Sequence, residues 1–261
     1  MAGEKTRVAV HKFSSCDGCQ LAFLNMGEAL LTLFEQVDIV HFAEAGPVDP
    51  TAVVDISFVE GSLSTAADLQ RIRAIRANSG FLVTIGACAT AGGLQALRNV
   101  ADQDDWVASV YATPDTISLL DKVTPINAQV KVDLEIHGCP VNTRQLTAAL
   151  RSLLAGVTPV DEQDKLCLEC KRRHHVCVMV TQGMPCMGPV TRTGCGALCP
   201  GVGRDCYGCY GAAENVNVSS LGGHFSTLQL DPAQTSHRLV SFNSADPAFS
   251  PGLAAGVKQN D

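Results

Sequence analysis

Short apolar runs alternate with amphipathic stretches through the first 157 residues. Strands are predicted where apolar residues crowd together, at residues 7–13, 37–42, 53–60, 81–85 and 130–136. Helices are predicted where apolar residues recur at helical spacing, at residues 20–33, 62–76 and 142–154, with Ser64 and Asn142 as N-caps. Residues 101–125 follow neither pattern, apart from a short helix expected around 116–120. The alternation of strand and helix predicts an α/β domain with a doubly wound parallel sheet over residues 1–158.

The pattern changes after Val157. Between Cys167 and Gly211 there is no sustained helical or strand period, and glycine, proline and cysteine dominate. Such a segment cannot bury a conventional core, so bonds to a bound inorganic group are expected to hold it. We therefore predict a second, small Cys-rich domain over residues 159–261. Its polar C-terminal tail, from Leu221 onward, is expected to lie over the surface or to be partly disordered.

Composition and charge exclude several classes of protein. The chain of 261 residues is 46% hydrophobic and 17% charged, enough to bury a sizeable core. Its net charge of −7 argues against a nucleic-acid-binding protein. No apolar run approaches the roughly 20 residues of a membrane helix, and the N-terminus carries neither a signal-peptide nor a twin-arginine pattern. We expect a cytoplasmic protein.

The twelve cysteines carry the chemical signal. In a reducing cytosol, clustered CxxC pairs are more typical of metal sites than of disulfides. Twelve cysteines make three sets of four. One set is dispersed over the first 140 residues, and the other eight cysteines lie within residues 167–209.

The dispersed set consists of Cys16, Cys19, Cys88 and Cys139, each of which closely follows a predicted strand. The carboxyl ends of parallel strands share one edge of the sheet, so the four thiols are expected to converge there as metal ligands. Glycines at 18, 86 and 138 would let the backbone approach a bulky inorganic group. Alternatively, Cys88 and Cys139 are buried small apolar residues and Cys16–Cys19 is a redox pair. A structural zinc site usually takes two local CxxC-type knuckles, unlike these long-range loops.

The other eight cysteines divide most simply in order along the chain. Cys167, Cys170, Cys177 and Cys186 form one set, and Cys195, Cys199, Cys206 and Cys209 form the next. A pair of zinc knuckles is the alternative. Three four-thiolate sites in one chain favour electron transfer, because iron–sulfur cubanes exchange single electrons and zinc does not.

Five motifs together resemble the small subunits of nickel–iron hydrogenases. These are CDGCQ at 16–20, GACATAGG at 86–93, GCP at 138–140, CMGPVT at 186–191 and CYGCYG at 206–211. The resemblance covers about residues 7–212. It implies a flavodoxin-like first domain, whose cluster lies beside the nickel–iron centre of a separate large subunit. It also implies three 4Fe–4S clusters: proximal on the dispersed set, medial on Cys195–Cys209 and distal on Cys167–Cys186.

The subtype follows from the same resemblance. Both local sets are fully cysteine, and CLECKRRHHVCVMV at 167–180 is most similar to the NAD(P)-linked, heterotetrameric, sulfhydrogenase-like type. That type implies a flavin- and iron–sulfur-containing, diaphorase-type partner that reduces NAD or NADP. The alternatives are an F420- or heterodisulfide-reductase-linked hydrogenase subunit, a quinone-reductase subunit, and a non-enzymatic sensor or zinc-held scaffold. A quinone-reductase subunit would carry a tandem Cys-Cys pair, which this chain lacks.

Several other polar residues have simpler interpretations. The run from Lys171 to His175 is expected to be a solvated loop, with a basic docking rim as the alternative. Glu60 is expected to cap or close a turn, with a part in proton movement as the alternative. His11, His41 and His137 are expected to be packed strand histidines.

Overall fold

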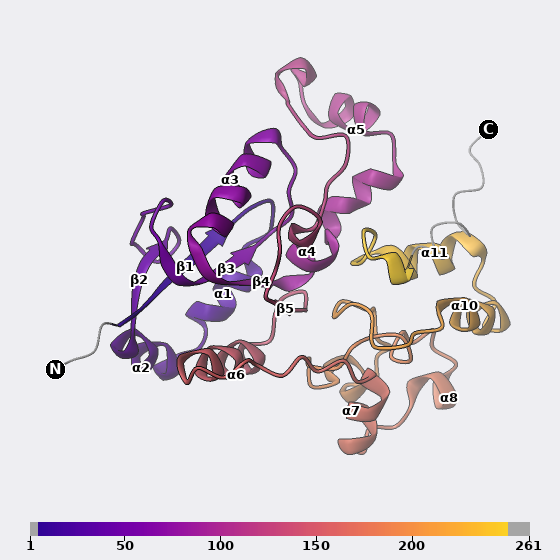
Figure 1. Ribbon diagram of the computed structural model, residues 1–261. Helices are drawn as coiled ribbons and strands as arrows, with labels where there is room; N and C mark the ends of the chain where they lie inside the picture. The colour runs from indigo at the N-terminus through magenta and orange to yellow at the C-terminus, as the bar shows by residue number, and fades with distance from the viewer. Residues whose placement is uncertain (1–4, 250–261) are drawn as a thin grey trace.

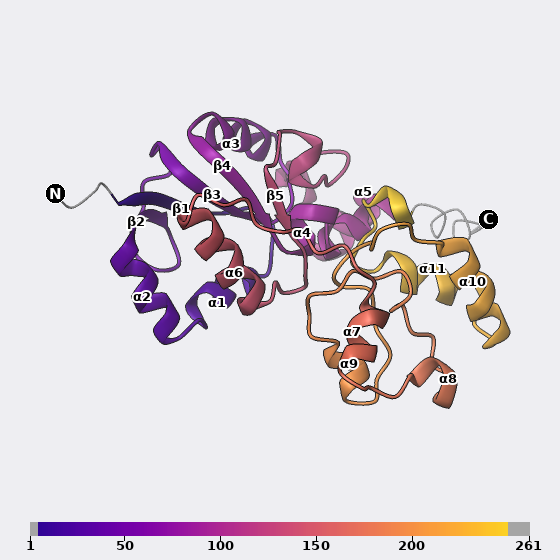
Figure 2. The same ribbon diagram turned by 60° about the horizontal axis from the view of Figure 1, so that its bottom comes forward.

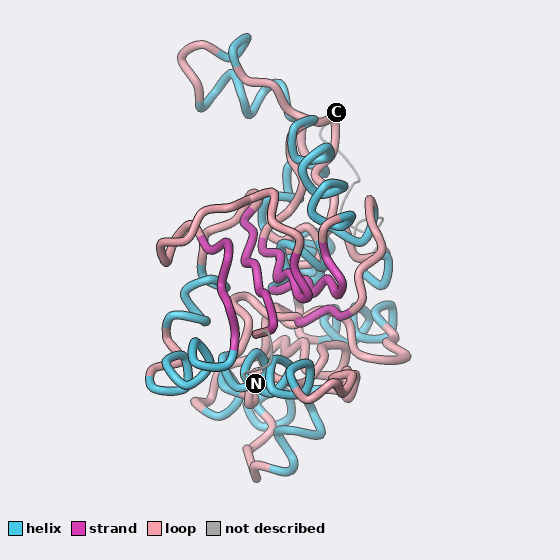
Figure 3. The backbone as a smooth tube through the Cα atoms, turned by 60° about the vertical axis from the view of Figure 1, so that its left-hand side comes forward, coloured by secondary structure: helices cyan, strands magenta, loops and turns pink. Residues whose placement is uncertain are grey.

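The computed structural model describes residues 5–249. A five-stranded, all-parallel sheet in the order β2-β1-β3-β4-β5 is built by the N-terminal part of the chain. Figure 3 shows the strands in one twisted layer, with helices around it. The strands are β1 Thr6–Lys12, β2 Val37–Phe42, β3 Val54–Glu60, β4 Ser79–Ile85 and β5 Leu134–Ile136. The predicted α/β fold class is confirmed.

Helices cover both faces of this sheet. Figure 2 shows α3 on one face and α1, α2 and α6 on the other. The bounds are α1 Gly18–Leu24, α2 Glu28–Gln36, α3 Ala66–Ala77, α4 Gly86–Ala91, α5 Gln103–Val110 and α6 Thr143–Leu154. Short 3-10 turns are η1 Leu94–Val100, η2 Pro114–Thr116 and η3 Ile126–Ala128.

Alternate strand residues supply the two apolar layers. Val10, Phe58 and Ile85 pack against α1, α2 and α6, whereas Val59 and Leu82 pack toward α3. Neighbouring side chains of a strand point to opposite faces, so a strand covered on both faces is apolar throughout. This packing fixes the carboxyl ends of the strands at one edge.

The largest differences between the predicted and observed elements concern two helices and one strand. The helix expected at 20–33 is two helices, because Gly27 takes a positive φ of 61° and turns the chain between them. The N-cap of α3 is Thr65, whose hydroxyl accepts the backbone N–H of Asp68; Ser64 lies one residue earlier. The strand expected at 130–136 is paired only over β5, since Val130 and Val132 pack into the second apolar layer beyond it.

The stretch at 101–125 is more ordered than predicted. It contains α5, whose N-cap Asp102 accepts the N–H groups of Asp104 and Asp105. The short helix expected around 116–120 is a single 3-10 turn that begins at Pro114. Helix α5 stands away from the sheet (Figure 1), and none of its residues is buried.

The Cys-rich segment, which is predicted to be a second domain, contains short helices around cysteine-bearing loops (Figure 1). Its helices are α7 Leu166–Arg172, α8 Val178–Gln182, α9 Leu198–Gly201, α10 Val218–Thr227, α11 Pro232–Val240 and the 3-10 turn η4 Pro247–Phe249. The prediction of a loose tail from Leu221 was wrong for the described residues. Leu221, Phe225 and Leu239 are buried in one apolar cluster, and Asn217 and Asp231 cap the two main helices. Residues 250–261 lie outside the described residues.

Over residues 5–249, none of the helices combines the length and the apolar character that a membrane crossing requires.

Candidate metal centres

The thiols of the dispersed set meet at the carboxyl edge of the sheet. Cys16 lies in the turn after β1, Cys19 in the first turn of α1, Cys88 in α4 after β4, and Cys139 in the turn after β5. Burial, with the nearby thiols of Cys139 and Cys16, raises the pKa of Cys88 to about 12. Burial also raises the pKa of Cys19, and Cys88 and Cys139 add to that effect. The structure therefore brings together the four residues that strand polarity predicts.

Glycines leave space beside these sulfurs. A Cβ on Gly86, whose φ is +85°, would overlap Cys19 Sγ. A Cβ on Gly93 would lie 2.6 Å from Cys88 Sγ. Only glycine combines the positive φ with the absence of a side chain at these two positions. The edge is thus shaped for close approach of backbone to the four thiols.

Glu60 supports the turn that carries Cys19. Its buried carboxylate accepts the backbone N–H of Cys19 at 3.2 Å and that of Gln20 at 3.0 Å. Burial raises the pKa of this carboxyl, and the two hydrogen bonds oppose the rise. These contacts are those of a cap, which is the simpler of the two interpretations of Glu60.

The first local set surrounds α7 and α8. Burial, with Cys167, Cys186 and further thiols nearby, raises the pKa of Cys170 to about 12. Cys167 and Cys186 flank Gly188, where a Cβ would lie 3.4 and 3.5 Å from their sulfurs. Cys177 is exposed at the start of α8. We call Cys167, Cys170, Cys177 and Cys186 the distal set.

The second local set lies between the other two. Burial, with Cys195, Cys139 and Cys199 nearby, raises the pKa of Cys209 to about 12. Cys139 belongs to the dispersed set, so the two sets are neighbours. On the other side, the backbone N–H of Cys206 donates to Cys186 Sγ of the distal set at 3.3 Å. We call Cys195, Cys199, Cys206 and Cys209 the medial set, and the dispersed set the proximal set.

The donor chemistry of each set fits an iron–sulfur cluster. All twelve cysteines are free of disulfides, and each set offers four sulfur donors, the number that a 4Fe–4S cluster takes. Within the described residues, no three His, Cys, Asp or Glu side chains form a ready-made site for a single metal ion. Backbone N–H groups also point to sulfur, from Val141 to Cys19 at 3.5 Å and from Gly208 to Cys206 at 3.4 Å. Such N–H donors are typical of iron–sulfur sites.

Sequence reasoning missed a buried carboxylate between two cysteines. Glu169 accepts the hydroxyl of Thr193 at 2.7 Å and the backbone N–H of Gly194 at 3.3 Å. Arg173 Nε lies 3.5 Å from the same carboxylate, so Arg173 is not simply part of a solvated loop. This network ties α7 to the loop that carries Cys195. An acidic residue between the cysteines of CLEC was the available signal.

The three histidines that were expected to be packed are buried, although His137 lies just after β5 and not within it. The rings of His11 and His41 stack with centroids 4.6 Å apart. Burial lowers the pKa of His11 to about 3, and His41 and Arg71 add to the effect. Burial likewise lowers the pKa of His137 to about 3.

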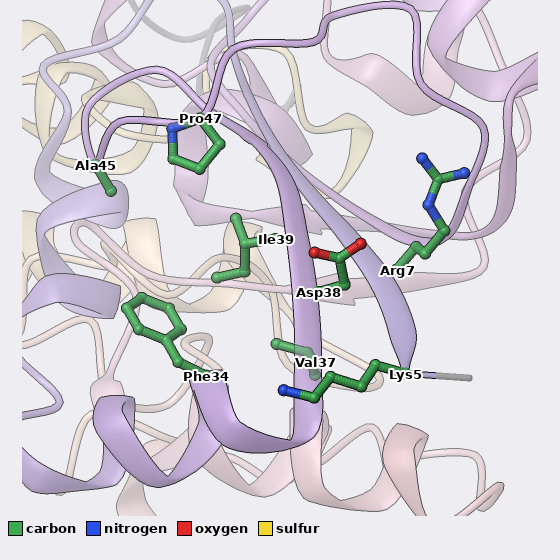
Figure 4. A pocket seen from close by; sticks show the side chains of 8 residues that line it. All are labelled: Lys5, Arg7, Phe34, Val37, Asp38, Ile39, Ala45 and Pro47. Carbon is green, nitrogen blue, oxygen red and sulfur yellow. The ribbon is translucent and has the colours of Figure 1, made fainter. Parts of the chain in front are cut away.

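One cavity lies beside the edge strand β2. Its volume is about 580 Å³, and it is lined by Lys5, Arg7, Phe34, Val37, Asp38, Ile39, Ala45 and Pro47. Figure 4 shows these side chains, which come from α2, the start of β1, β2 and the loop after β2, with no cysteine among them. It is separate from the three sets.

Known proteins resemble this chain over most of its length. The family described as NADH ubiquinone oxidoreductase, 20 Kd subunit, matches residues 16–153. The chain is 33% identical to sulfhydrogenase 2 subunit delta of Pyrococcus furiosus over 215 residues, which cover 82% of this chain and 90% of that protein. It is 28% identical to a subunit of the F420-non-reducing hydrogenase of Methanococcus voltae, over 92% of this chain and 94% of that one.

A solved structure is similar as well. A chain in the crystal structure of an NAD+-reducing [NiFe]-hydrogenase in the H2-reduced state superposes with a TM-score of 0.56 at 29% identity. The match covers 60% of this chain and 96% of that chain.

Proposed function

Because this chain belongs to the family of the 20 Kd subunit of NADH ubiquinone oxidoreductase and is a subunit of a nickel–iron-type hydrogenase, we propose that it is the electron-relay small subunit of an NAD(P)-linked enzyme. It would pass electrons between the H2-activating site of a large subunit and a flavin- and iron–sulfur-containing partner that reduces NAD or NADP. The observation that supports this most is the contact of the medial set with both other sets.

Three 4Fe–4S clusters would occupy the three sets. Such clusters supply one-electron carriers whose potentials respond to burial and to hydrogen bonds on sulfur. The chain's own residues would bind the clusters and hold them in place. The cysteines would ligate the iron, Glu60 holds the turn of Cys19, and Glu169 links the distal and medial loops. No residue of this chain is required to bind hydrogen or nickel.

The large subunit would dock at the edge of the sheet that carries the proximal set. Cys16 is exposed there. Nearby, a cavity of about 390 Å³ runs from Ser14 and Gln95 to Trp106 and Tyr111. Trp106 is 52% exposed and Val110 73% exposed. An apolar surface of this kind marks a protein interface, and this one adjoins the proximal set.

The nucleotide-reducing partner would dock at the distal set. Helices α7 and α8 lie on the side of the second domain away from the sheet (Figures 1 and 2). The exposed Cys177 lies among exposed Val176 and Val180, with Lys171 and Arg172 close in sequence on α7. The apolar centre formed by the two valines and the basic rim formed by Lys171 and Arg172 together suit a partner with an acidic surface. The relay would work in the cytoplasm, where NAD and NADP are available.

The first test is a count of iron, sulfide, zinc and nickel in the anaerobically purified native complex. About twelve irons on this chain are expected, four for each cubane, with nickel in a co-purifying subunit. H2-dependent reduction of NAD or NADP by the same sample would support the NAD(P)-linked subtype. Reduction of neither nucleotide, with reduction of a heterodisulfide system, would favour the F420-non-reducing type to which the chain is also similar. Reduction of F420 would favour the coenzyme F420 hydrogenase type. Zinc in place of iron would overturn the proposal.

A single substitution tests the route. Cys16→Ser removes one proximal ligand and should abolish coupled turnover from H2 to NAD(P). Iron content and electron paramagnetic resonance must first establish that the proximal cluster is missing. Wild-type turnover in such a sample would contradict the relay.

A further inference from the structure

Tyr210 lies between the proximal and medial sets. It follows Cys209 directly and is 4% exposed. Its hydroxyl donates to the carbonyl oxygen of Pro140 at 3.4 Å, and Pro140 follows Cys139 directly. Tyr210, Pro140 and the hydrogen bond between them therefore join a medial cysteine to a proximal one.

The ring of Tyr210 also packs against the loop that carries Cys139. A Cβ on Gly138 would lie 2.9 Å from Tyr210 Cζ. Gly138 takes a φ of +142°, so its own backbone requires glycine, and the missing side chain leaves the position that the tyrosine ring covers. This contact joins the two domains directly beside Cys139.

The surroundings of the phenol agree with a bridging position. Burial raises the pKa of Tyr210, and Cys195, Cys209 and Cys19 raise it further. Two of these thiols are medial and the third is proximal. The phenol ring thus lies among thiols of both sets.

We propose that Tyr210 is the positioning residue that couples the proximal and medial sites. The path runs from Cys209 to its neighbour Tyr210, across the hydrogen bond from the Tyr210 hydroxyl to Pro140, and from Pro140 to its neighbour Cys139. This inference rests on the proposed relay. One electron leaves the proximal site and the same electron enters the medial site, while Tyr210 keeps its proton and its own electrons. The tyrosine provides a short bonded route and holds the two domains at a fixed separation.

The test uses the intact anaerobic complex with Tyr210→Phe and Tyr210→Leu. The first variant keeps the ring and removes the bond to Pro140; the second also removes the ring contact with Gly138. Tyr207→Phe is the matched control, since Tyr207 lies in the same loop but is 40% exposed. Three quantities are measured: iron per chain, the midpoint potential of each cluster, and the rate of medial reduction after mixing with H2, followed by freeze-quench electron paramagnetic resonance.

Tyr210→Phe is expected to slow medial reduction several-fold with iron content and midpoint potentials unchanged. Tyr210→Leu should slow it more and weaken the spin–spin interaction between the two reduced clusters. Tyr207→Phe should match wild type. Wild-type reduction rates and spin coupling in a fully loaded Tyr210→Phe protein would overturn the inference while leaving the relay intact. Absence of reducible iron–sulfur signals in the wild-type complex would instead overturn the relay itself.

Discussion

Burial sets the chemistry of the individual thiols. Cys19, Cys186 and Cys206 are almost fully enclosed, and burial raises the pKa of each. A buried thiolate is costly unless a cation or several hydrogen bonds offset the lost hydration. The backbone donors on these sulfurs supply part of that compensation, and a bound cluster would supply the rest.

The stacked histidines predict a pH dependence of stability. The pKa of His11 falls from 6.5 to about 3 on folding, so below pH 6.5 the unfolded chain binds a proton that the folded chain does not. Stability from this residue is therefore complete above pH 6.5 and is lost as pH falls toward 3. At one pH unit below 6.5 the loss is about 1.4 kcal/mol.

His11→Phe should flatten this dependence while keeping a ring against His41. The measurement is the apparent melting temperature of the anaerobic complex at pH 7.5 and 5.5. The fall between the two pH values should be smaller in the variant than in wild type. His224→Phe, at an exposed position, is the control and should leave the fall unchanged. Equal falls in wild type and His11→Phe would contradict the assignment.

At this scale the sequence predicts positions better than contacts. The meeting of Cys16, Cys19, Cys88 and Cys139 follows from strand polarity alone, whereas their role as ligands stays a prediction. Glu169 and Tyr210 were missed because their partners lie in other loops, and spacing within one segment carries no information about such contacts. His11 and His41 were expected to pack, but not against each other.

Among the elements, α7 carries the charge most relevant to a partner. Lys171 and Arg172 are exposed, and Arg172 has only a solvent-exposed ion pair with Asp164 at 3.3 Å. Lys171→Glu with Arg172→Glu should lower the rate of electron delivery to the nucleotide-reducing partner about tenfold at low ionic strength, because steering depends on rim charge. The difference should shrink as salt is added.

Stopped-flow reduction of the partner at several salt concentrations measures this effect. Lys122→Glu with Lys131→Glu gives the same change in net charge on the first domain and should have little effect. Reduction of a small dye by H2 should be normal in both variants, which separates docking from loss of the relay. Equal rates for the two double variants at low salt would count against the basic docking rim.

The helices of the C-terminal segment are elements that composition did not predict. Arg238 on α11 pairs with Asp205 at 2.5 Å, next to Cys206, and its guanidinium lies 4.7 Å from the centroid of the Tyr207 ring. Both members of the ion pair are largely enclosed. The polar composition of this segment suggested a loose tail because its few apolar residues, such as Phe225 and Leu239, are widely spaced along the sequence.

Arg238→Met should destabilise the protein by about 3 kcal/mol, since it leaves the Asp205 carboxylate enclosed without its partner. Thermal unfolding of the anaerobic complex measures the change. The double variant Asp205→Asn with Arg238→Met should recover part of the loss, because no enclosed charge then remains. A single variant as stable as wild type would show that solvent already compensates Asp205.

For the whole molecule, the order of the three sets is the feature with most consequence. The medial set neighbours the proximal set through Cys139 and the distal set through Cys186. Cysteine spacing alone gives the three sets but not this order, since the middle set in space is the last along the chain; the order was expected only from the family resemblance. The reversal arises because the loops from Cys195 to Cys209 fold back against the sheet edge after the distal loops have turned away from it.

This order makes a prediction that depends on the whole molecule. Cys195→Ser should remove the medial cluster and divide the relay in two. Under H2 the proximal signal should appear in electron paramagnetic resonance while the distal signal stays absent. Added NADH or NADPH, acting through the partner, should then reduce the distal site and leave the proximal site oxidised. Iron content must fall by about four per chain, the content of one cubane. Distal reduction by H2 at the wild-type rate in that sample would mean that electrons pass between the outer sites directly, and that the medial set is not the link.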